Sequence, residues 1–339
     1  MSWPEAFEVY TQKPIAIFGA GVSGLAAKRL VEHKGGEAWV FDEQCGNPFN
    51  PQAAREVGLV ILSPGFSPEH PWLKIAHEAH LRILPELDFA SVFWPGPLIA
   101  ITGTNGKSTL TELLCAALKE AHHPAVSVGN IGYALSLAVI EPNELPQTAV
   151  CEVSSFQAEN LELLTPDALL WTNFSEDHLE RHLSLESYFR AKWRLVERLK
   201  PGAPCILGAE VARVAQSLNL CLPAKTKVID FAAPNASRGP QGTVFYTRPQ
   251  QDNYLLAKAY FEAAGLDLQA LERAARSLQL SPHRLQKVAT VGGVGFWNDS
   301  KGTNFAAVLA ALNYFKPNKV LWLGGGKAKG GDIAQFART

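Results

Sequence analysis

A buried strand that leads directly into a glycine loop and then into a helix constrains the fold of this chain most strongly. In "LIAITGTNGKSTLTELL", which starts at Leu98, an apolar run is followed by Gly103 and Gly106 and then by apolar residues at helical spacing. The glycines allow a tight turn, and a helix that starts there directs free backbone N–H groups at an anion. The stretch therefore predicts a phosphate-binding loop in an α/β sheet.

The loop ends like the common phosphate-binding pattern, but its spacing differs. Gly106, Lys107 and Ser108 match the final G-K-[ST], whereas Ile101 stands where that pattern has its first glycine. Lys107 is expected to reach the terminal phosphates, and Ser108 or Thr109 to hold the magnesium that bridges them. A plain helix start with Ser and Thr near the N-cap is the alternative.

A second glycine motif lies near the N-terminus. "GAGVSG", residues Gly19–Gly24, follows an apolar strand, and Asp42 ends the next strand. This arrangement resembles a dinucleotide fingerprint, in which the acid binds a ribose hydroxyl. A glycine-rich turn that serves only close helix packing is the alternative.

Polar residues also follow two later strands. Glu152 ends a strand in "CEVSSFQAENLE", where a carboxylate can bind a hard metal ion. "WTNFSEDHLERH" places Asn173, Asp177 and His178 after another strand, and Lys192 follows in the expected helix "LESYFRAKWRLVERL". Taken singly, each has a structural alternative: an edge carboxylate, a helix-capping aspartate or a solvated lysine.

Charged residues gather around strand ends near the C-terminus. "HRLQKV", "NDSKGTN" and "GGGKAKGGD" contain Arg284, Asp299, Lys301, Lys327 and Lys329. Basic residues are usually solvated surface groups, but their clustering at strand ends favours an anion site.

Strands and helices alternate along the chain, which predicts an α/β fold. The Pro-Gly-Pro cluster at 95–97 and Ser281-Pro282 suggest boundaries, so we expect domains at 1–95, 96–281 and 282–339. The last of these is too small to bury both faces of a sheet, and we expect it to be incomplete. Further expected elements are strands in "GLVILSPGF", "RILPELDF", "TAVCEVSSF", "DALLWTNF", "APCILG", "TKVIDFA" and "KVLWLGGG", a hairpin in "ATVGGVGFWNDS", and helices over 253–264 and 304–314.

Composition limits the classes of partner. A net charge of -1 gives no general attraction for nucleic acid, and no apolar run is long enough for membrane insertion. The five cysteines are odd in number, scattered along the chain and without the close pairs of zinc or redox motifs, which favours buried free thiols in a reducing cytosol. With no leader in Met1 to Lys13, we expect a cytoplasmic protein.

Taken in order, "GTNGKST", "EVSSFQ", "TNFSEDHLERH", "AKWRL", "HR" and "NDSKGTN" resemble the Mur ligase family of ATP-dependent amide-forming enzymes. The family's loop has the shortened form G-T-N-G-K-[ST], which accounts for the spacing. "SSFQ", "GAGVSGLA" and "SPG" are most similar to members that add D-glutamate to UDP-N-acetylmuramoyl-L-alanine in peptidoglycan synthesis. The resemblance implies a Rossmann-like UDP-binding domain, a central P-loop ATPase domain and a Rossmann-like C-terminal domain. We expect a monomer.

The resemblance also implies a role for each matching residue. Lys107, Lys192 and His178 would be catalytic, with Lys192 carbamylated by carbon dioxide, and two magnesium ions would be held by Ser108, Glu152, His178 and Lys192. ATP would bind to Gly103, Thr104, Asn105, Gly106, Lys107, Ser108, Thr109, Asn253, Arg284 and Asp299. The UDP substrate would bind to Gly19, Ala20, Gly21, Val22, Ser23, Asp42, Ser63, Pro64, Gly65 and Asn130. D-Glutamate would bind to Lys301, Thr303 and Lys329, with Lys327 competing for the last role.

Three other functions remain open at this point. A nicotinamide-dependent dehydrogenase would use "GAGVSG" but leave the G-K-S loop without a role. Another ligase of the same family would add L-alanine, a diamino acid or glutamate to folate. A non-enzymatic binding module would follow from an incomplete C-terminal domain, because the family's domain continues well beyond Thr339.

Overall fold

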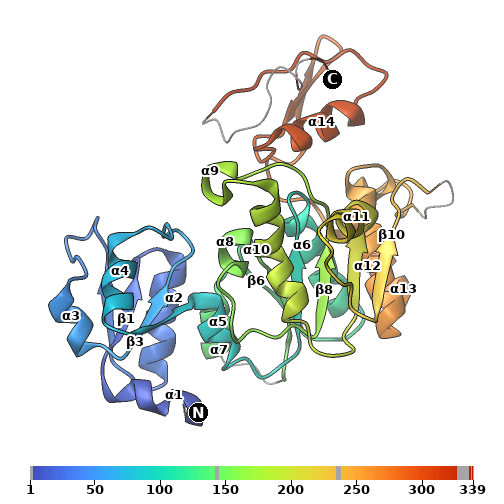
Figure 1. The fold of residues 1–339 in the computed structure, drawn as a ribbon. Helices are drawn as coiled ribbons and strands as arrows, with labels where there is room; N and C mark the ends of the chain where they lie inside the picture. The colour runs from blue at the N-terminus through green and yellow to red at the C-terminus, as the bar shows by residue number, and fades with distance from the viewer. Residues whose placement is uncertain (1–2, 142–144, 234–237, 327–335, 337, 339) are drawn as a thin grey trace. The chain divides into compact units, whose positions relative to one another are not determined.

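The computed structural model describes residues 3–141, 145–233, 238–326, 336 and 338. Helices alternate with parallel strands, which confirms the predicted α/β class (Figure 1). The chain forms two compact units. One comprises residues 1–100, 124–168 and 190–203, and the other comprises 101–123, 169–189 and 204–339.

The N-terminal segment builds a four-stranded parallel sheet in the order β2-β1-β3-β4. Helices cover both faces of this sheet (Figure 1), so every residue of β1 is buried, as is typical of parallel strands. Phe18 and Val60 pack with Trp72 of α4 in one core. The elements are α1 (Glu5–Glu8), a 3₁₀ helix (Val9–Gln12), β1 (Ile15–Phe18), α2 (Val22–His33), β2 (Ala38–Phe41), α3 (Pro51–Glu56), β3 (Leu59–Leu62), α4 (Pro71–Glu78), β4 (Arg82–Pro85) and α5 (Glu86–Ser91).

A second sheet has six strands in the order β10-β9-β8-β5-β7-β6. Helices α12 and α13 pack against α6, and Arg273 of α13 is paired with Glu120 of α6 at 3.1 Å. The elements are β5 (Leu98–Thr102), α6 (Lys107–Glu120), β6 (Ala125–Gly129), α7 (Leu135–Ile140), β7 (Thr148–Glu152), α8 (Ser155–Ala158), β8 (Ala168–Trp171), α9 (Leu179–His182), α10 (Leu185–Glu197), β9 (Cys205–Gly208), α11 (Ala209–Ser217), β10 (Thr226–Ile229), a 3₁₀ helix (Val244–Tyr246), α12 (Gln250–Ala264) and α13 (Leu268–Ser277).

The C-terminal segment contains the expected hairpin, β11 (Gln286–Val291) and β12 (Val294–Asn298), followed by α14 (Phe305–Tyr314). The strand predicted in "KVLWLGGG" is wrong, because residues 319–326 have no strand structure. Apolar content alone does not make a strand; the backbone also needs a neighbour to pair with. Leu321 and Leu323 are exposed instead.

Two other strands differ from the sequence prediction. In "RILPELDF" the strand stops at Pro85 and α5 begins at Glu86, because Glu86 and Asp88 in the first turn favour a helix N-terminus. Strand β6 was missed, because the run Ala125–Gly129 has no continuous apolar character and only part of it is buried.

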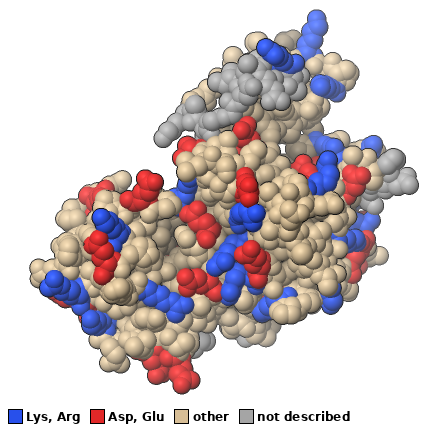
Figure 2. Space-filling model, in the orientation of Figure 1, with Lys and Arg blue, Asp and Glu red and all other residues tan. Residues whose placement is uncertain are grey.

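Surface charges of both signs are mixed. Figure 2 shows Lys and Arg side chains next to Asp and Glu on the face in view, and several form ion pairs, such as Lys200 with Asp167 at 2.7 Å. All five cysteines are free thiols, but the predicted burial holds only for Cys115, Cys151 and Cys205, because Cys45 and Cys221 are exposed. Among the described residues, no helix has the length and apolar character that a membrane crossing requires.

Asp88 of α5 anchors the loop that precedes β8. Its fully buried carboxylate accepts hydrogen bonds from the backbone N–H groups of Glu162 (2.7 Å), Leu163 (3.0 Å) and Leu164 (2.7 Å). Burial raises the pKa of Asp88, while these three N–H groups act against that rise.

Asp88→Ala is expected to lower the free energy of unfolding by about 3 kcal/mol, because backbone donors lose their acceptor at a cost of about 1–3 kcal/mol each where they stay buried. Urea denaturation monitored by circular dichroism measures the change. Asp88→Asn keeps one acceptor oxygen, so its free energy of unfolding should lie between those of the wild type and Asp88→Ala. A loss below about 0.5 kcal/mol for Asp88→Ala would contradict this role, since that is the range of ordinary surface substitutions.

Candidate phosphate-binding site

The loop between β5 and α6 depends on two glycines with positive φ. Gly103 has φ 140°, and a Cβ there would collide with the Thr172 hydroxyl. Gly106 has φ 83° and is the N-cap of α6, and a Cβ there would lie 2.8 Å from Asn253 Oδ1. Side chains are excluded at both positions, so the loop backbone stays close to its neighbours.

Polar groups at the end of β8 fix this loop. Thr104 N–H donates to Asn173 O at 3.0 Å, and Asn105 N–H donates to Asn173 Oδ1 at 2.9 Å. Asn173 Nδ2 donates back to Asn105 O at 3.0 Å, and the Thr172 hydroxyl donates to the same oxygen at 2.6 Å. These four hydrogen bonds hold the backbone of the loop against the end of β8.

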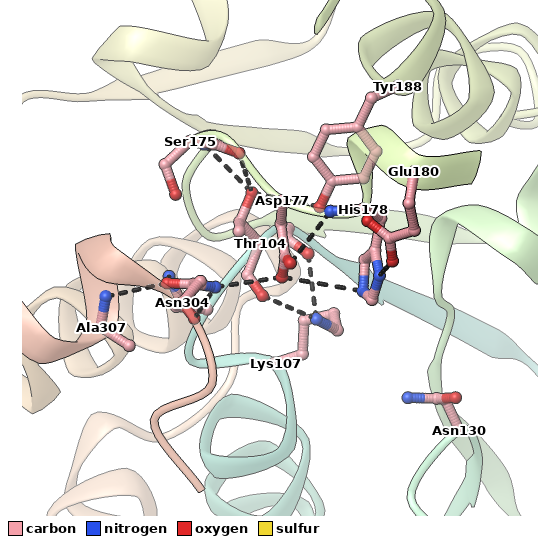
Figure 3. A network of polar contacts seen from close by, with 12 residues as sticks. Thr104, Lys107, Asn130, Ser175, Asp177, His178, Glu180, Tyr188, Asn304 and Ala307 are labelled. Carbon is pink, nitrogen blue, oxygen red and sulfur yellow. Dashed lines mark hydrogen bonds and ion pairs between the residues drawn. The ribbon is translucent and has the colours of Figure 1, made fainter. Parts of the chain in front are cut away.

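Lys107 begins α6 and turns its side chain back over the loop (Figure 3). Its Nζ donates to Gly103 O at 3.0 Å and to Thr104 O at 2.9 Å. A cation thus lies beside the positive end of the α6 dipole, an arrangement that attracts an anion. Thr109, in the same first turn, has a buried hydroxyl that finds no hydrogen-bond partner within the described part of the chain.

Asp177 and His178 lie beside the loop, as Figure 3 shows. Asp177 is 7% exposed, and its Oδ2 lies 3.7 Å from His178 Nε2, while His178 Nδ1 lies 3.5 Å from Glu180 Oε1. His178 has a φ of 54°, which sets it at the turn into α9. The Tyr188 hydroxyl donates to Thr104 Oγ1 at 3.3 Å, and burial raises the pKa of this phenol.

Glu152 ends β7, as predicted, and is 2% exposed. Its Oε1 accepts from Asn130 Nδ2 at 2.8 Å, whereas its buried Oε2 has no hydrogen-bond partner among the described residues. A buried carboxylate oxygen without a partner is costly, so this atom suits a ligand. The "SSFQ" motif that follows forms a capping box, in which Ser154 and Gln157 bond reciprocally at the start of α8.

Lys192 of α10 is 1% exposed, in contrast to the solvated alternative. Lysine is almost never fully buried unless its charge is compensated. Among the described residues, no group of three or more His, Cys, Asp and Glu side chains is arranged to hold a metal ion.

The N-terminal glycine motif and Asp42 meet at the end of the first sheet. Asp42 accepts from Ala20 N–H at 2.7 Å and from Gln44 N–H at 2.8 Å, and these bonds lower its pKa. Gly19 has φ 98°, and a Cβ there would lie 3.0 Å from the buried Ser63 hydroxyl. No residue that the structure describes forms a hydrogen bond with this hydroxyl. A Cβ at Gly24 would collide with Gly19 O, so close helix packing also requires this glycine.

The predicted C-terminal site residues are only partly brought together. Asp299 Oδ1 accepts from Leu285 N–H at 2.9 Å. The pKa of Asp299 is raised, because burial outweighs the opposing effects of this hydrogen bond and of the positive charge of Arg284. Arg284 Nε is buried and has no hydrogen-bond partner in the described ranges 3–141, 145–233 and 238–326 or at residues 336 and 338. Lys301 is exposed beside Thr303, and Lys329 lies outside the described residues, as does Lys327.

The sequence interpretation missed several residues of this network. Thr172 and Tyr188 contact the loop, and Asn304 hydrogen-bonds to Asn105 and Asp177. Thr172 could have been found, because it follows a buried strand beside Asn173. Tyr188 and Asn304 are far from the loop in sequence, and no local pattern indicates them.

Comparisons with known proteins support a family assignment. Residues 101–268 match the Mur ligase middle domain. Two relatives named UDP-N-acetylmuramoylalanine--D-glutamate ligase are similar, one from Aquifex aeolicus (32% identity, 94% of this chain, 77% of that protein) and one from Synechococcus sp. (34%, 95% and 78%). In fold, the chain is similar to the UDP-N-acetylmuramate:L-alanyl-gamma-D-glutamyl-meso-diaminopimelate ligase of Neisseria meningitides (TM-score 0.57, 15% identity, 79% of this chain, 99% of that chain). This chain belongs to the Mur ligase family.

Proposed function

We propose that the protein forms an amide bond between UDP-N-acetylmuramoyl-L-alanine and D-glutamate at the expense of ATP, in peptidoglycan synthesis. The names of relatives at 32–34% identity support the substrates. The observation that carries the proposal is the glycine loop with Lys107 over it, held by Thr172 and Asn173 at the end of β8.

A carboxylate does not react with an amine at neutral pH, because its oxygen is a poor leaving group. Transfer of the γ-phosphoryl group of ATP to the alanyl carboxylate would give an acyl phosphate and ADP. The amine of D-glutamate would then attack the acyl carbon, phosphate would leave, and the amine would lose a proton. Lys107 and the N–H groups of the loop would bind the phosphates and offset the repulsion between two anions.

The residues present fit magnesium. Glu152 Oε2 is buried and unpaired by any residue that the structure describes, and the Ser108 hydroxyl lies in the first turn of α6, so each offers a hard oxygen. We assign His178 to the same task, and carbamylated Lys192 would add another oxygen. When bound, magnesium supplies positive charge that polarises the phosphoryl and carboxylate oxygens.

The remaining assignments follow the resemblance. Gly103 through Thr109 with Asn253, Arg284 and Asp299 would bind ATP, and Asn253 is buried against Gly106. Gly19 to Ser23, Asp42, Ser63 to Gly65 and Asn130 would bind the UDP substrate. Lys301, Thr303 and Lys329 would bind D-glutamate. We also propose the domain division 1–95, 96–281 and 282–339, a monomeric state and a cytoplasmic location, where ATP is available.

Phosphate release tests the proposal. With ATP, magnesium and UDP-N-acetylmuramoyl-L-alanine, phosphate should appear only when D-glutamate is added. L-Alanine or meso-diaminopimelate in place of D-glutamate, and UDP-N-acetylmuramate in place of the alanyl substrate, are the controls. Phosphate release with a different amino acid would assign another ligase activity of the family. The absence of phosphate release with every amino acid tested would refute ligation.

A further inference from the structure

Asn304 is the N-cap of α14, and its side chain does more than cap the helix. Its Oδ1 accepts from Ala307 N–H at 2.9 Å, the usual N-cap bond. The same oxygen accepts from Asn105 Nδ2 at 3.2 Å. Its Nδ2 donates to Asn105 Oδ1 at 3.1 Å and to Asp177 Oδ2 at 3.0 Å (Figure 3).

An amide is the side chain that satisfies this set of partners. Asn has two N–H donors and an oxygen with two lone pairs, and here all four positions are used. Ionised aspartate has no donor, and serine is too short to serve both partners beyond the helix. The requirement at position 304 is therefore stricter than helix capping alone, for which Asn, Asp and Ser are nearly equal.

We propose that Asn304 is a positioning residue that fixes the start of α14 against the phosphate loop. Asn105 belongs to that loop, Asp177 precedes His178, and Lys301 and Thr303 immediately precede Asn304 in the chain. One amide thus sets the distance between the loop that binds ATP and the residues assigned to D-glutamate. The inference rests on the proposed function for its effect on the reaction.

Asn304→Asp gives the sharpest test. It keeps the cap of α14, but it removes both amide donors and places a carboxylate against Asp177. We expect D-glutamate-dependent phosphate release to fall ~100-fold, with a higher KM for D-glutamate and a KM for ATP within ~3-fold of wild type, as for a displaced reacting group. If Asn304 only capped the helix, this variant would match wild type.

Asn304→Ser is the matched control for charge. It also keeps a capping oxygen but adds no negative charge, so we expect a smaller loss of ~10-fold with the same rise in KM for D-glutamate. A double-mutant cycle with Asn105→Ala tests the contact itself. The double variant should release phosphate no more slowly than the slower of the two single variants. If the fold-losses of the single variants instead multiply in the double variant, the two residues act independently.

Hydrogen exchange tests the contact independently of activity. Asn105→Ala removes two hydrogen bonds to Asn304 but leaves the cap intact. Exchange in residues 305–314 should accelerate ~10-fold in this variant, although the substitution lies far away in sequence. Unchanged exchange would overturn the inference even if ligation is confirmed. Accelerated exchange without D-glutamate-dependent phosphate release in wild type would instead refute only the proposed function.

Discussion

Lys107→Ala is expected to reduce D-glutamate-dependent phosphate release by ~10²–10³-fold or more, equivalent to about 3 kcal/mol or more of transition-state stabilisation. Lys107 Nζ lies within 3.0 Å of Gly103 O and Thr104 O, where its charge would face a phosphate bound to the loop. The charge counts most during phosphoryl transfer, because two anions must then approach each other. Steady-state kinetics with saturating D-glutamate measures the loss.

The matched control for Lys107 lies on the same helix. Lys119, near the other end of α6, is exposed, so Lys119→Ala removes the same charge away from the loop. It should retain activity within ~2-fold, as expected for a surface change. Circular dichroism should show both variants folded. Activity of folded Lys107→Ala within ~3-fold of wild type would refute the assigned role.

Local patterns predicted the strand, loop and helix at the centre of the candidate site. The strand, loop and helix from Leu98 to Glu120 lie as expected, because glycine turns and helix starts are set by neighbouring residues. Asn173 was placed at a strand end by the same reasoning and proves to bind Asn105. The buried position of Lys192 also excludes the solvated alternative.

Contacts between distant segments could not be predicted in this way. Tyr188 reaches Thr104, and Asn304 reaches Asn105, across long stretches of chain. Capping explains the residue type at Asn304 locally, and only the folded structure reveals the additional partners. The prediction of a strand at 319–326 was wrong for the same reason. A strand forms only where the backbone finds a pairing partner, and the segment's own sequence does not contain that partner.

Lys192→Ala is expected to lower phosphate release at least ~100-fold, and added formate or acetate should restore part of it. Lys192 is 1% exposed, so a derivative formed on its amine would be shielded from bulk water. The neutral amine can attack carbon dioxide, and loss of a proton gives a carbamate whose oxygen atoms can bind magnesium. A small carboxylate that enters the space left in Lys192→Ala would supply similar oxygen atoms.

Two measurements separate this chemistry from a packing defect. Lys200 is exposed and paired with Asp167, so it provides the control. Lys200→Ala should keep wild-type activity, and formate should not change that activity. In wild type, ¹³C-labelled bicarbonate should give a carbamate signal that is absent from Lys192→Ala. Two results together would contradict the carbamate: a folded, inactive Lys192→Ala whose activity no small carboxylate restores, and a wild type without a carbamate signal. The lysine would then act as a buried amine, and magnesium would need a different ligand.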